Sequence, residues 1–328
     1  MKKINSSGSH ATDLNRSWER LKHVGSVNYP PFLSRTLPAG VKDVLRELRE
    51  RILGPYLTRR LPRNKEFEQS PEDAQASASL SIVVPVHDAP EVTQRCLVSL
   101  QKYAPKAEIF LVDDGSKLEE TQKLLGDFST RNGWKLIRHP EALRHSAACS
   151  AGASLATRPY LCLLNSDTVV TPWCWRPLVQ VFENNPTIGV AGPSTSFSGN
   201  PQTLPDALLM RHYLNDSQIC EYARHLLAES ADPVLTDLSY AAGCAFFIRR
   251  ELWQQLGGFD RNIPDYLNEG ELCRRVLGAG YRAVWVRSAY IHHLGGVSYR
   301  KALGREAIDT HYRDAADYIK RKFRSAAP

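Results

Sequence analysis

Acidic side chains follow two apolar stretches of the sequence at the point where each stretch ends. Asp113 and Asp114 close "AEIFLVDD", and Asn165, Ser166 and Asp167 close "PYLCLLNSD". A carboxylate in such a place can accept hydrogen bonds from a nucleoside, and a single aspartate suits a hard cation such as Mn²⁺ or Mg²⁺ that also binds a diphosphate. Each motif has a structural alternative as well, because "DDGS" can be a capped strand–helix turn and Asp167 a solvated turn residue.

The elements around these motifs alternate between strand and helix. Apolar runs predict strands at 80–86, 107–114, 134–139 and 159–167, and helical patterns lie between them at 91–103, 117–133 and 145–156. Helical crossovers of this length join parallel strands. In a parallel sheet, ligands bind beyond the carboxyl ends of the strands, where all four strands carry polar residues. The sequence therefore predicts an α/β fold with a mostly parallel, Rossmann-like central sheet flanked by helices.

The composition is that of a globular protein with a mild basic excess. The 328 residues include 42 Lys and Arg against 35 Asp and Glu, a net charge of +7. That excess favours phosphate-bearing partners without requiring nucleic acid. The seven cysteines are scattered and never spaced CxxC, which indicates free thiols rather than disulfides or a zinc site. With no signal sequence and no apolar run near the ~20 residues of a membrane span, we expect a cytoplasmic protein that does not bind nucleic acid.

Residues 1–78 differ from the rest and contain a basic helical candidate. In "VKDVLRELRERILGPYLTRRLPR" apolar residues recur at helical spacing with arginines between them. Such a helix can lie on an anionic membrane, here at the inner face, or it can pack on its own domain with a solvated basic face. We therefore expect an N-terminal helical extension with either peripheral membrane contact or a structural role.

Six stretches that follow one another along the chain carry a resemblance to a known family. They are "SIVVPVHDAPEVTQRCLVSL", "LVDDGS", "LLNSDTVV", "YAAGCAFFIRRELWQQLGGFDRNI", "ELCRRVLGAGYRAVWV" and "HHLGGVS". Together they resemble glycosyltransferase family 2, which has the GT-A fold, and the pattern is similar to that of rhamnosyltransferases. The resemblance spans residues 80–300 and implies inverting transfer of a sugar from a nucleoside diphosphate to an acceptor hydroxyl.

The resemblance assigns the donor side of the site. In the family, the end of the first strand and the "DDGS" carboxylates hold the nucleoside, which maps to Pro85, Val86, Asp113 and Asp114. Asn165, Ser166 and Asp167 stand at the "DxD" position, where the aspartate binds Mn²⁺ or Mg²⁺ and the diphosphate. His293 is in register to complete the metal shell, although a histidine that ends an apolar stretch is more often structural.

The resemblance assigns the acceptor side to the second half of the chain. Gly257, Gly258 and Asp260 belong to a "GGFD" loop on that side. Glu269 is in register with the catalytic base, which must take the proton of the incoming hydroxyl. Glu271 would rather position the acceptor, and both glutamates could alternatively be first-turn residues that favour the helix dipole.

Four residues depart from the family pattern, namely Asn165, Asn268, Arg144 and His145. Asn165 replaces the first acid of "DxD", and Asn268 stands where many relatives carry an acid beside the base. Either change could weaken metal binding, alter donor choice or abolish catalysis. Arg144 stands where the family has small or amide residues, and it could pair with a donor phosphate.

The sequence thus predicts a metal-dependent, inverting glycosyltransferase of surface polysaccharide or glycoconjugate synthesis. The donor would be a UDP-, TDP- or GDP-sugar, and the acceptor a glycan, a lipid-linked glycan or a protein. The alternative is a catalytically silent, glycosyltransferase-like module that binds nucleotide or glycan or acts as a scaffold for partners. A nucleotidyltransferase is disfavoured because no glycine- and basic-rich phosphate loop follows the first strand. The expected divisions are an extension and linker (1–78), a catalytic domain (79–300, with its nucleotide-binding half at 79–170 and its acceptor half at 171–300) and a C-terminal helix (301–328).

Overall fold

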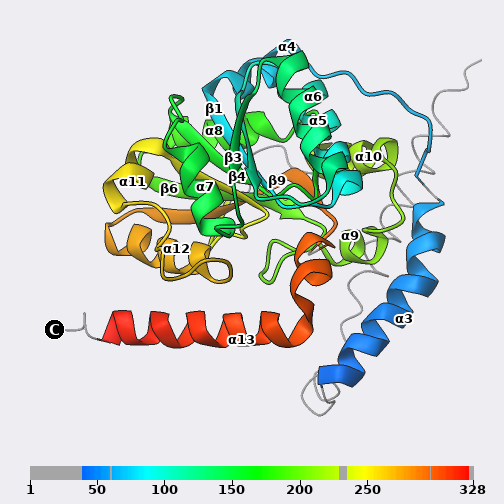
Figure 1. Cartoon of the computed structure of the whole chain (residues 1–328). Coiled ribbons are helices and arrows are strands. Elements are labelled where there is room, and N and C mark those ends of the chain that lie inside the picture. Colours follow the sequence, from blue (N-terminus) through cyan, green and yellow to red (C-terminus); the bar gives the residue numbers. More distant parts are fainter. Residues whose placement is uncertain (1–38, 60, 229–234, 296, 325–328) are drawn as a thin grey trace, which may run out of the picture.

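The protein is an α/β structure built around one large sheet (Figure 1). The computed structural model describes residues 39–59, 61–228, 235–295 and 297–324, so the expectations for residues 1–38 lie outside the described residues. The nine strands described form a single sheet in the order β3-β2-β1-β4-β8-β6-β9-β5, with β7 paired to β9. The predicted α/β fold with a helix-flanked sheet is confirmed.

The first half of the sheet is parallel, as predicted. Its strands are β1 (Leu80–Val86), β2 (Glu108–Asp114), β3 (Lys135–His139) and β4 (Tyr160–Leu164). They pair in parallel as β3-β2-β1-β4. The crossovers are α5 (Pro90–Tyr103), α6 (Glu119–Asn132) and α7 (His145–Ala153). All four carboxyl ends therefore meet at one edge of the sheet.

The second half of the sheet mixes the two pairings. Its strands are β5 (Thr168–Val170), β6 (Ile188–Thr195), β7 (Leu235–Asp237), β8 (Ala245–Arg249) and β9 (Arg282–His293). β6 and β9 are parallel, while β8 runs antiparallel to β4 and β6, and β5 and β7 run antiparallel to β9. The chain thus passes from the end of β4 across to β5 at the far edge, and residues 165–167 make this crossing.

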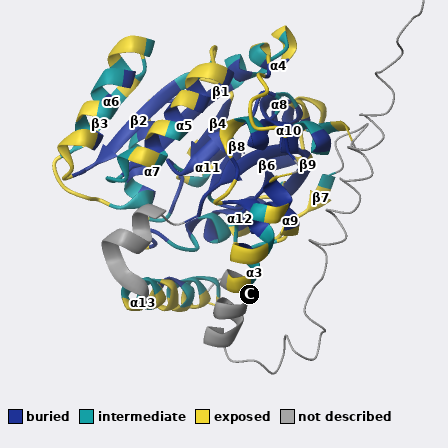
Figure 2. Cartoon of the chain, turned by 90° about the vertical axis from the view of Figure 1, so that its right-hand side faces the viewer, coloured by how far each residue is buried: buried dark blue, intermediate teal, exposed yellow. Residues whose placement is uncertain are grey.

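Helices cover both faces of the sheet because its strands are apolar on both sides (Figure 2). Ile82 and Val84 of β1 face one core together with α5, α6 and α8 (Trp175–Asn184). Val83 faces the other core, with α7, α11 (Arg250–Leu256) and α12 (Asn268–Gly278). The seven cysteines are all buried and free, as predicted.

The remaining helices lie at the margins of the sheet. The helix α3 (Ala39–Thr58) packs with α9 (Pro205–Met210) and α10 (Asp216–Ala228) in a third apolar cluster that includes Val169 of β5 and Tyr290 of β9. A short helix, α4 (Pro71–Ala76), and a 3₁₀ turn (Ser77–Ser79) lead into β1. The C-terminal helix α13 (Val297–Arg324) runs beside α12 (Figure 1). Among the described helices, none combines the length and the apolar character that crossing a bilayer requires.

Candidate active site

A cavity of about 460 Å³ opens at the carboxyl edge of the parallel strands. Its walls come from the ends of β1 and β2, the crossing at 165–167, the loop before β8, the start of α12 and the end of β9. Nine of the predicted site residues line it: Pro85, Val86, Asp114, Arg144, Asn165, Ser166, Asp167, Glu269 and His293. The other five, Asp113, Gly257, Gly258, Asp260 and Glu271, lie outside its lining.

Asp167 and His293 face each other in this cavity. They meet because β5 pairs with β9 in a register that sets Thr168 opposite His293. His293 Nε2 lies 3.1 Å from Asp167 Oδ1, and both side chains are buried. Burial acts to lower the pKa of His293, but the Asp167 carboxylate outweighs it and holds that pKa well above its usual value. The carboxylate thus favours the protonated form of the imidazole.

The ring of His293 is held in one orientation by a backbone carbonyl. Its Nδ1 donates a hydrogen bond of 2.6 Å to the carbonyl of Phe197. A histidine fixed in this way presents its other nitrogen, Nε2, which can bind a metal once its proton is displaced. No set of three or more acidic, histidine or cysteine side chains that could enclose a metal exists among the described residues. The pair thus fits a divalent cation that takes its remaining ligands from a diphosphate and water.

Asp114 organises the rim of the cavity. Its carboxylate accepts hydrogen bonds from the backbone N–H groups of Leu143 (2.9 Å) and Arg144 (2.8 Å) and lies 2.7 Å from His139 Nδ1. Gly115 has φ +70°, and a Cβ there would collide with the backbone of Glu141. The "DDGS" turn therefore packs directly on the loop 140–144.

Asp113 makes the contacts of a turn residue. Its Oδ1 accepts from the N–H of Ser116 at 3.0 Å, and its Oδ2 pairs with Arg138 at 3.3 Å. The first contact caps the tight turn, and the second joins β2 to β3. The structure thus separates two adjacent aspartates that the sequence treats alike, and only Asp114 reaches the cavity.

Arg144 lines the cavity with its guanidinium already engaged. The guanidinium forms an ion pair with Asp265 and donates a hydrogen bond of 2.6 Å to His311 Nδ1 of α13. Arg144 also has φ +76°, a left-handed conformation that is unfavourable for a side chain with a Cβ. Its backbone N–H is held by Asp114, which maintains this conformation. Arg144 therefore links the loop 140–144 to the loop before α12 and to α13.

Glu269 lies in the first turn of α12 and points into the cavity. Burial raises its pKa to about 7. The carboxyl group occupies space that exists because residue 243 is glycine, since a Cβ there would collide with Glu269 Oε1. Asn268 holds the start of the helix: its side chain donates to Ser146 Oγ (2.9 Å) and accepts from the N–H of Glu269 (3.0 Å). Asn268 thus positions the start of α12 beside Glu269. An ionised acid could not replace it, because a carboxylate has no N–H to donate to Ser146 Oγ.

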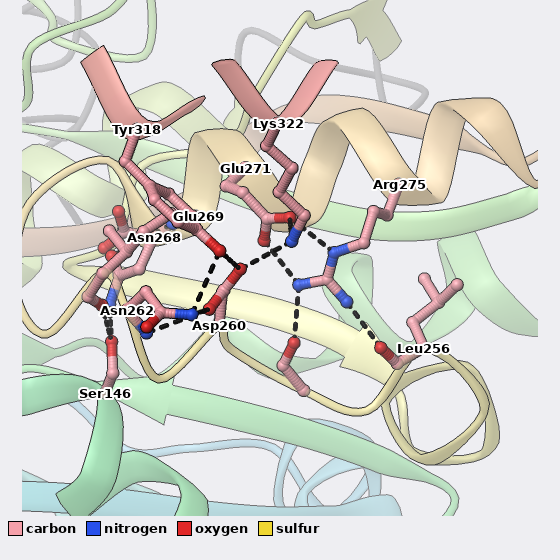
Figure 3. Close-up of polar contacts among 12 residues, drawn as sticks. Ser146, Leu256, Asp260, Asn262, Asn268, Glu269, Glu271, Arg275, Tyr318 and Lys322 are labelled. Atoms are coloured by element: carbon pink, nitrogen blue, oxygen red, sulfur yellow. Dashed lines mark hydrogen bonds and ion pairs between the residues drawn. The ribbon is translucent and has the colours of Figure 1, made fainter. Parts of the chain in front are cut away.

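Asp260 and Glu271 form ion pairs with the C-terminal helix and do not line the cavity (Figure 3). Lys322 of α13 reaches Asp260 Oδ2 at 2.6 Å and Glu271 Oε1 at 2.7 Å. Arg275 completes the cluster at 2.5 Å from Glu271 Oε2, and Tyr318 donates to Asp260 Oδ2 at 3.0 Å. Burial acts to raise the pKa of Asp260, but Lys322 and the other donors lower it to about 2.

Gly257 and Gly258 end α11. Both have positive φ, +77° and +67°, which glycine adopts without strain. A Cβ on Gly258 would also collide with the ring of Trp253. Their place in the structure is therefore a helix C-terminus and the turn that leads to Asp260.

Sequence reasoning missed the aromatic part of the cavity. Phe197, Tyr240, Tyr266 and Tyr312 all line it, together with the acid Asp265. Isolated aromatic residues in loops give no periodic signal, and Tyr312 comes from α13, far along the chain. The one local signal in the sequence was "PDY" at 264–266, which places an acid and a tyrosine shortly before Glu269.

Solved structures with a similar fold are glycosyltransferases. GalNAc-T7, in a crystal structure with UDP, GalNAc and Mn²⁺, matches 65% of this chain and 43% of its own at 20% identity, with a TM-score of 0.51. The mannosyltransferase PcManGT from Pyrobaculum calidifontis, in complex with GDP-Man and Mn²⁺, matches 93% of this chain and 76% of its own at 15% identity, again with a TM-score of 0.51. At these identities the likeness establishes the fold, which is that of the GT-A glycosyltransferases.

Sequence comparison identifies the family. The profile of Glycosyl transferase family 2 matches residues 81–257, more than half of the chain, so the chain belongs to glycosyltransferase family 2. "Uncharacterized protein y4gI" of Sinorhizobium fredii (strain NBRC 101917 / NGR234) is 20% identical over 256 residues, which are 75% of this chain and 28% of that protein. "O-antigen biosynthesis protein RfbC" of Myxococcus xanthus is 26% identical over 236 residues, 65% of this chain and 17% of that protein. The chain thus spans less than a third of the length of either relative.

Proposed function

We propose that this protein transfers a sugar from a nucleoside diphosphate to an acceptor hydroxyl with inversion and with the help of a divalent cation. One observation carries the proposal: a carboxyl group with a raised pKa, Glu269, opens into the same cavity as the Asp167–His293 pair. Membership of glycosyltransferase family 2 supports it. A base and an anion-binding pair in one cavity are the two parts that a direct displacement at the anomeric carbon needs.

Glu269 acts as the general base. A carboxyl group with a pKa of about 7 is ionised in a large fraction of molecules at neutral pH and is far more basic than an ordinary carboxylate. It can take the proton of the acceptor hydroxyl while the oxygen attacks the anomeric carbon. Its fixed position between Gly243 and Asn268 limits the directions from which that hydroxyl can approach.

Asp167 and His293 hold the cation on the donor side. When bound there, Mn²⁺ or Mg²⁺ would neutralise charge on the leaving diphosphate. Asn165, at the first position of the "DxD" motif, uses its backbone N–H for a hydrogen bond to the carbonyl of Cys244. This replacement leaves Asp167 as the anionic ligand of the motif.

Pro85, Val86 and Asp114 form the nucleoside side of the site, with Asp113 holding the turn behind them. Arg144 would contact the donor phosphates after release from Asp265 and His311. UDP-, TDP- and GDP-sugars are the candidate donors. The UDP and GDP-Man found in the two similar structures favour the first and the last of these.

Acceptor binding is proposed for the side of the cavity that α12 and α13 border. Tyr240 and Tyr312 offer aromatic faces and hydroxyl groups there, and such surfaces suit the apolar face and the hydroxyls of a sugar ring. Asp260 and Glu271 contribute by fixing α13, the helix that carries Tyr312. The name of the Myxococcus relative supports a polysaccharide acceptor.

We also propose that α3 touches an anionic membrane surface from the cytoplasmic side. Leu48, Ile52 and Tyr56 follow at intervals of four residues and are 50%, 64% and 54% exposed. Exposed Arg51 and Arg59 flank this row, so the face is both apolar and basic. Sedimentation with phosphatidylglycerol vesicles should fall strongly in the Leu48→Gln/Ile52→Gln variant. Equal sedimentation of the variant, or equal binding to phosphatidylcholine vesicles, would refute this contact.

Nucleotide binding with and without metal tests the main proposal. UDP or GDP should bind more tightly with Mn²⁺ than with a chelator, and Asp167→Asn should remove that difference. Hydrolysis or transfer from a panel of UDP-, TDP- and GDP-sugars should then identify the donor. Metal-dependent binding without turnover on any donor or acceptor would instead support the silent-module alternative. Metal-indifferent binding would contradict the role of Asp167.

A further inference from the structure

An ion pair is buried between the N-terminal helix and the catalytic domain. Glu50 of α3 and Arg211, which follows α9, are each 6% exposed, and Glu50 Oε2 lies 3.2 Å from Arg211 Nη2. Removing two charges from water costs several kcal/mol per ion, so burial of such a pair is weak evidence for a stabilising role. Glu50 also lies outside the segment 81–257 that the family profile matches. The pair therefore calls for an explanation other than stability.

Arg211 holds the loop that carries Phe197. Its guanidinium carbon lies 4.5 Å from the centre of the Phe197 ring, a cation–π contact. Arg211 also reaches the end of β9 through its backbone, because its carbonyl accepts a hydrogen bond of 2.9 Å from His292 Nε2. The ring of His292 is fully buried, and the hydroxyl of Tyr290 donates to its Nδ1 at 2.9 Å.

Phe197 in turn holds His293. The two rings pack with their centres 5.9 Å apart, and the carbonyl of Phe197 accepts the Nδ1 proton of His293 at 2.6 Å. Gly295, with φ +86°, leaves room for the Phe197 ring, since a Cβ there would collide with it. Phe197 is thus fixed between Arg211 on one side and the end of β9 on the other. Its position decides where His293 Nε2 points.

We propose that Glu50 and Arg211 are positioning residues that orient His293 toward the cation, so that the N-terminal helix is a working part of the metal site. This inference rests on the metal role proposed above. The series of contacts runs from Glu50 to Arg211, then through the Phe197 ring and carbonyl to His293 and Asp167. Loss of partners that orient a metal-binding histidine typically lowers metal affinity about 10- to 100-fold.

A double variant separates this role from stability. Glu50→Leu/Arg211→Met replaces the pair by apolar side chains, an exchange that is often neutral or stabilising. We expect its melting temperature to stay near that of the wild type while the affinity for Mn²⁺, measured by calorimetry with UDP present, falls about 10- to 100-fold. Phe197→Leu removes the ring between Arg211 and His293 while both charges of the ion pair stay in place. It should give the same loss, which keeps the inference testable if the double variant does not fold.

Arg249→Met is the matched control. The guanidinium of Arg249 also lies over an aromatic ring, 5.4 Å from the centre of Phe182, and donates to the carbonyls of Phe182 and Ile188. Arg249 does not line the cavity. Its loss should lower the melting temperature and leave the affinity for Mn²⁺ unchanged.

A second readout does not depend on metal. The nitrogen chemical shifts of the His293 ring, measured in the metal-free full chain and assigned by their loss in His293→Gln, should differ between the double variant and the wild type. If the wild type does not bind Mn²⁺ with UDP, the proposed metal role fails, and these shifts alone decide whether Arg211 orients the ring. A folded double variant with unchanged Mn²⁺ affinity and unchanged shifts would overturn the inference.

Discussion

Glu269 should lower the stability of the folded protein at the pH where it serves as a base. Its pKa is about 7 in the folded state against 4.5 for an ordinary glutamate, so folding disfavours its ionised form. The folded state therefore binds more protons than the unfolded state between pH 4.5 and 7, and stability falls as pH rises through that window. Above pH 7 the whole penalty is present.

The size of the penalty follows from the two pKa values. At about 1.4 kcal/mol for each pKa unit, the difference between 4.5 and about 7 corresponds to at most about 3.5 kcal/mol. Glutamine has nearly the same shape and cannot ionise. Glu269→Gln should therefore stay close to the wild type in stability at pH 5, where only a small part of the penalty is present, and exceed it at pH 8, with a melting temperature roughly 4–6 °C higher for a chain of this size. Turnover should fall by about 10²–10⁴-fold, the usual contribution of a general base, while UDP binding stays.

Glu271→Gln is the matched control, two residues away on the same helix. Glu271 is fully buried and pairs with Arg275 and Lys322, so its neutralisation leaves cations without their partner and should lower stability at pH 8. Melting curves of the three proteins at pH 5 and pH 8, with turnover at pH 8, complete the assay. If Glu269→Gln shifts the melting temperature equally at both pH values, or keeps its turnover, the reasoning about Glu269 is wrong.

Three further changes test the surroundings of the base. Gly243→Ala should lower turnover by about 10²-fold without removing any carboxyl group, because the new methyl displaces Glu269; unchanged kcat would contradict this. Asp114→Asn should weaken UDP binding and lower the free energy of unfolding by about 1–3 kcal/mol, as urea denaturation would reveal, because an amide cannot accept both backbone N–H groups of the loop. Asp260, whose pKa is lowered to about 2 against the usual 3.8, adds stability above pH 3.8 that disappears as the pH falls toward 2. Lys322→Met should remove most of this acid dependence, and circular dichroism between pH 2 and 6 should detect the loss; an unchanged acid transition would argue against the Lys322 contact.

The parallel half of the fold could be predicted from sequence because each element carries its own pattern. The first strand is expected at 80–86 and found at Leu80–Val86, and the fourth strand is expected at 159–167 and found at Tyr160–Leu164. The antiparallel half follows from pairings that local patterns do not encode. β5 has three residues, and only its partner β9, more than a hundred residues later, makes it a strand.

The site was predictable to the same degree. Asp167 and Glu269 stand out locally, at a strand end and at a helix start, and both line the cavity. Asp260 and Glu271 were expected on the acceptor side, but Lys322, some fifty residues further along, binds both carboxylates. An acid in a sequence does not reveal which cation will reach it after folding. Asp113 and Asp114 are likewise distinguished only by folding, because Asp113 contacts Ser116 and Arg138 while Asp114 lines the cavity.

The seven buried cysteines give the protein internal reporters of its own opening. A thiol reacts with a disulfide reagent only when it is accessible and ionised, and burial raises the pKa of Cys96 and of Cys273 to about 12. Cys96 lies on α5 and Cys273 on α12, on opposite faces of the sheet. The labelling rate of each thiol should therefore report how often its own layer of helices detaches from the sheet. If a bound nucleotide slows one rate more than the other, the slowed thiol identifies the layer that the nucleotide stabilises.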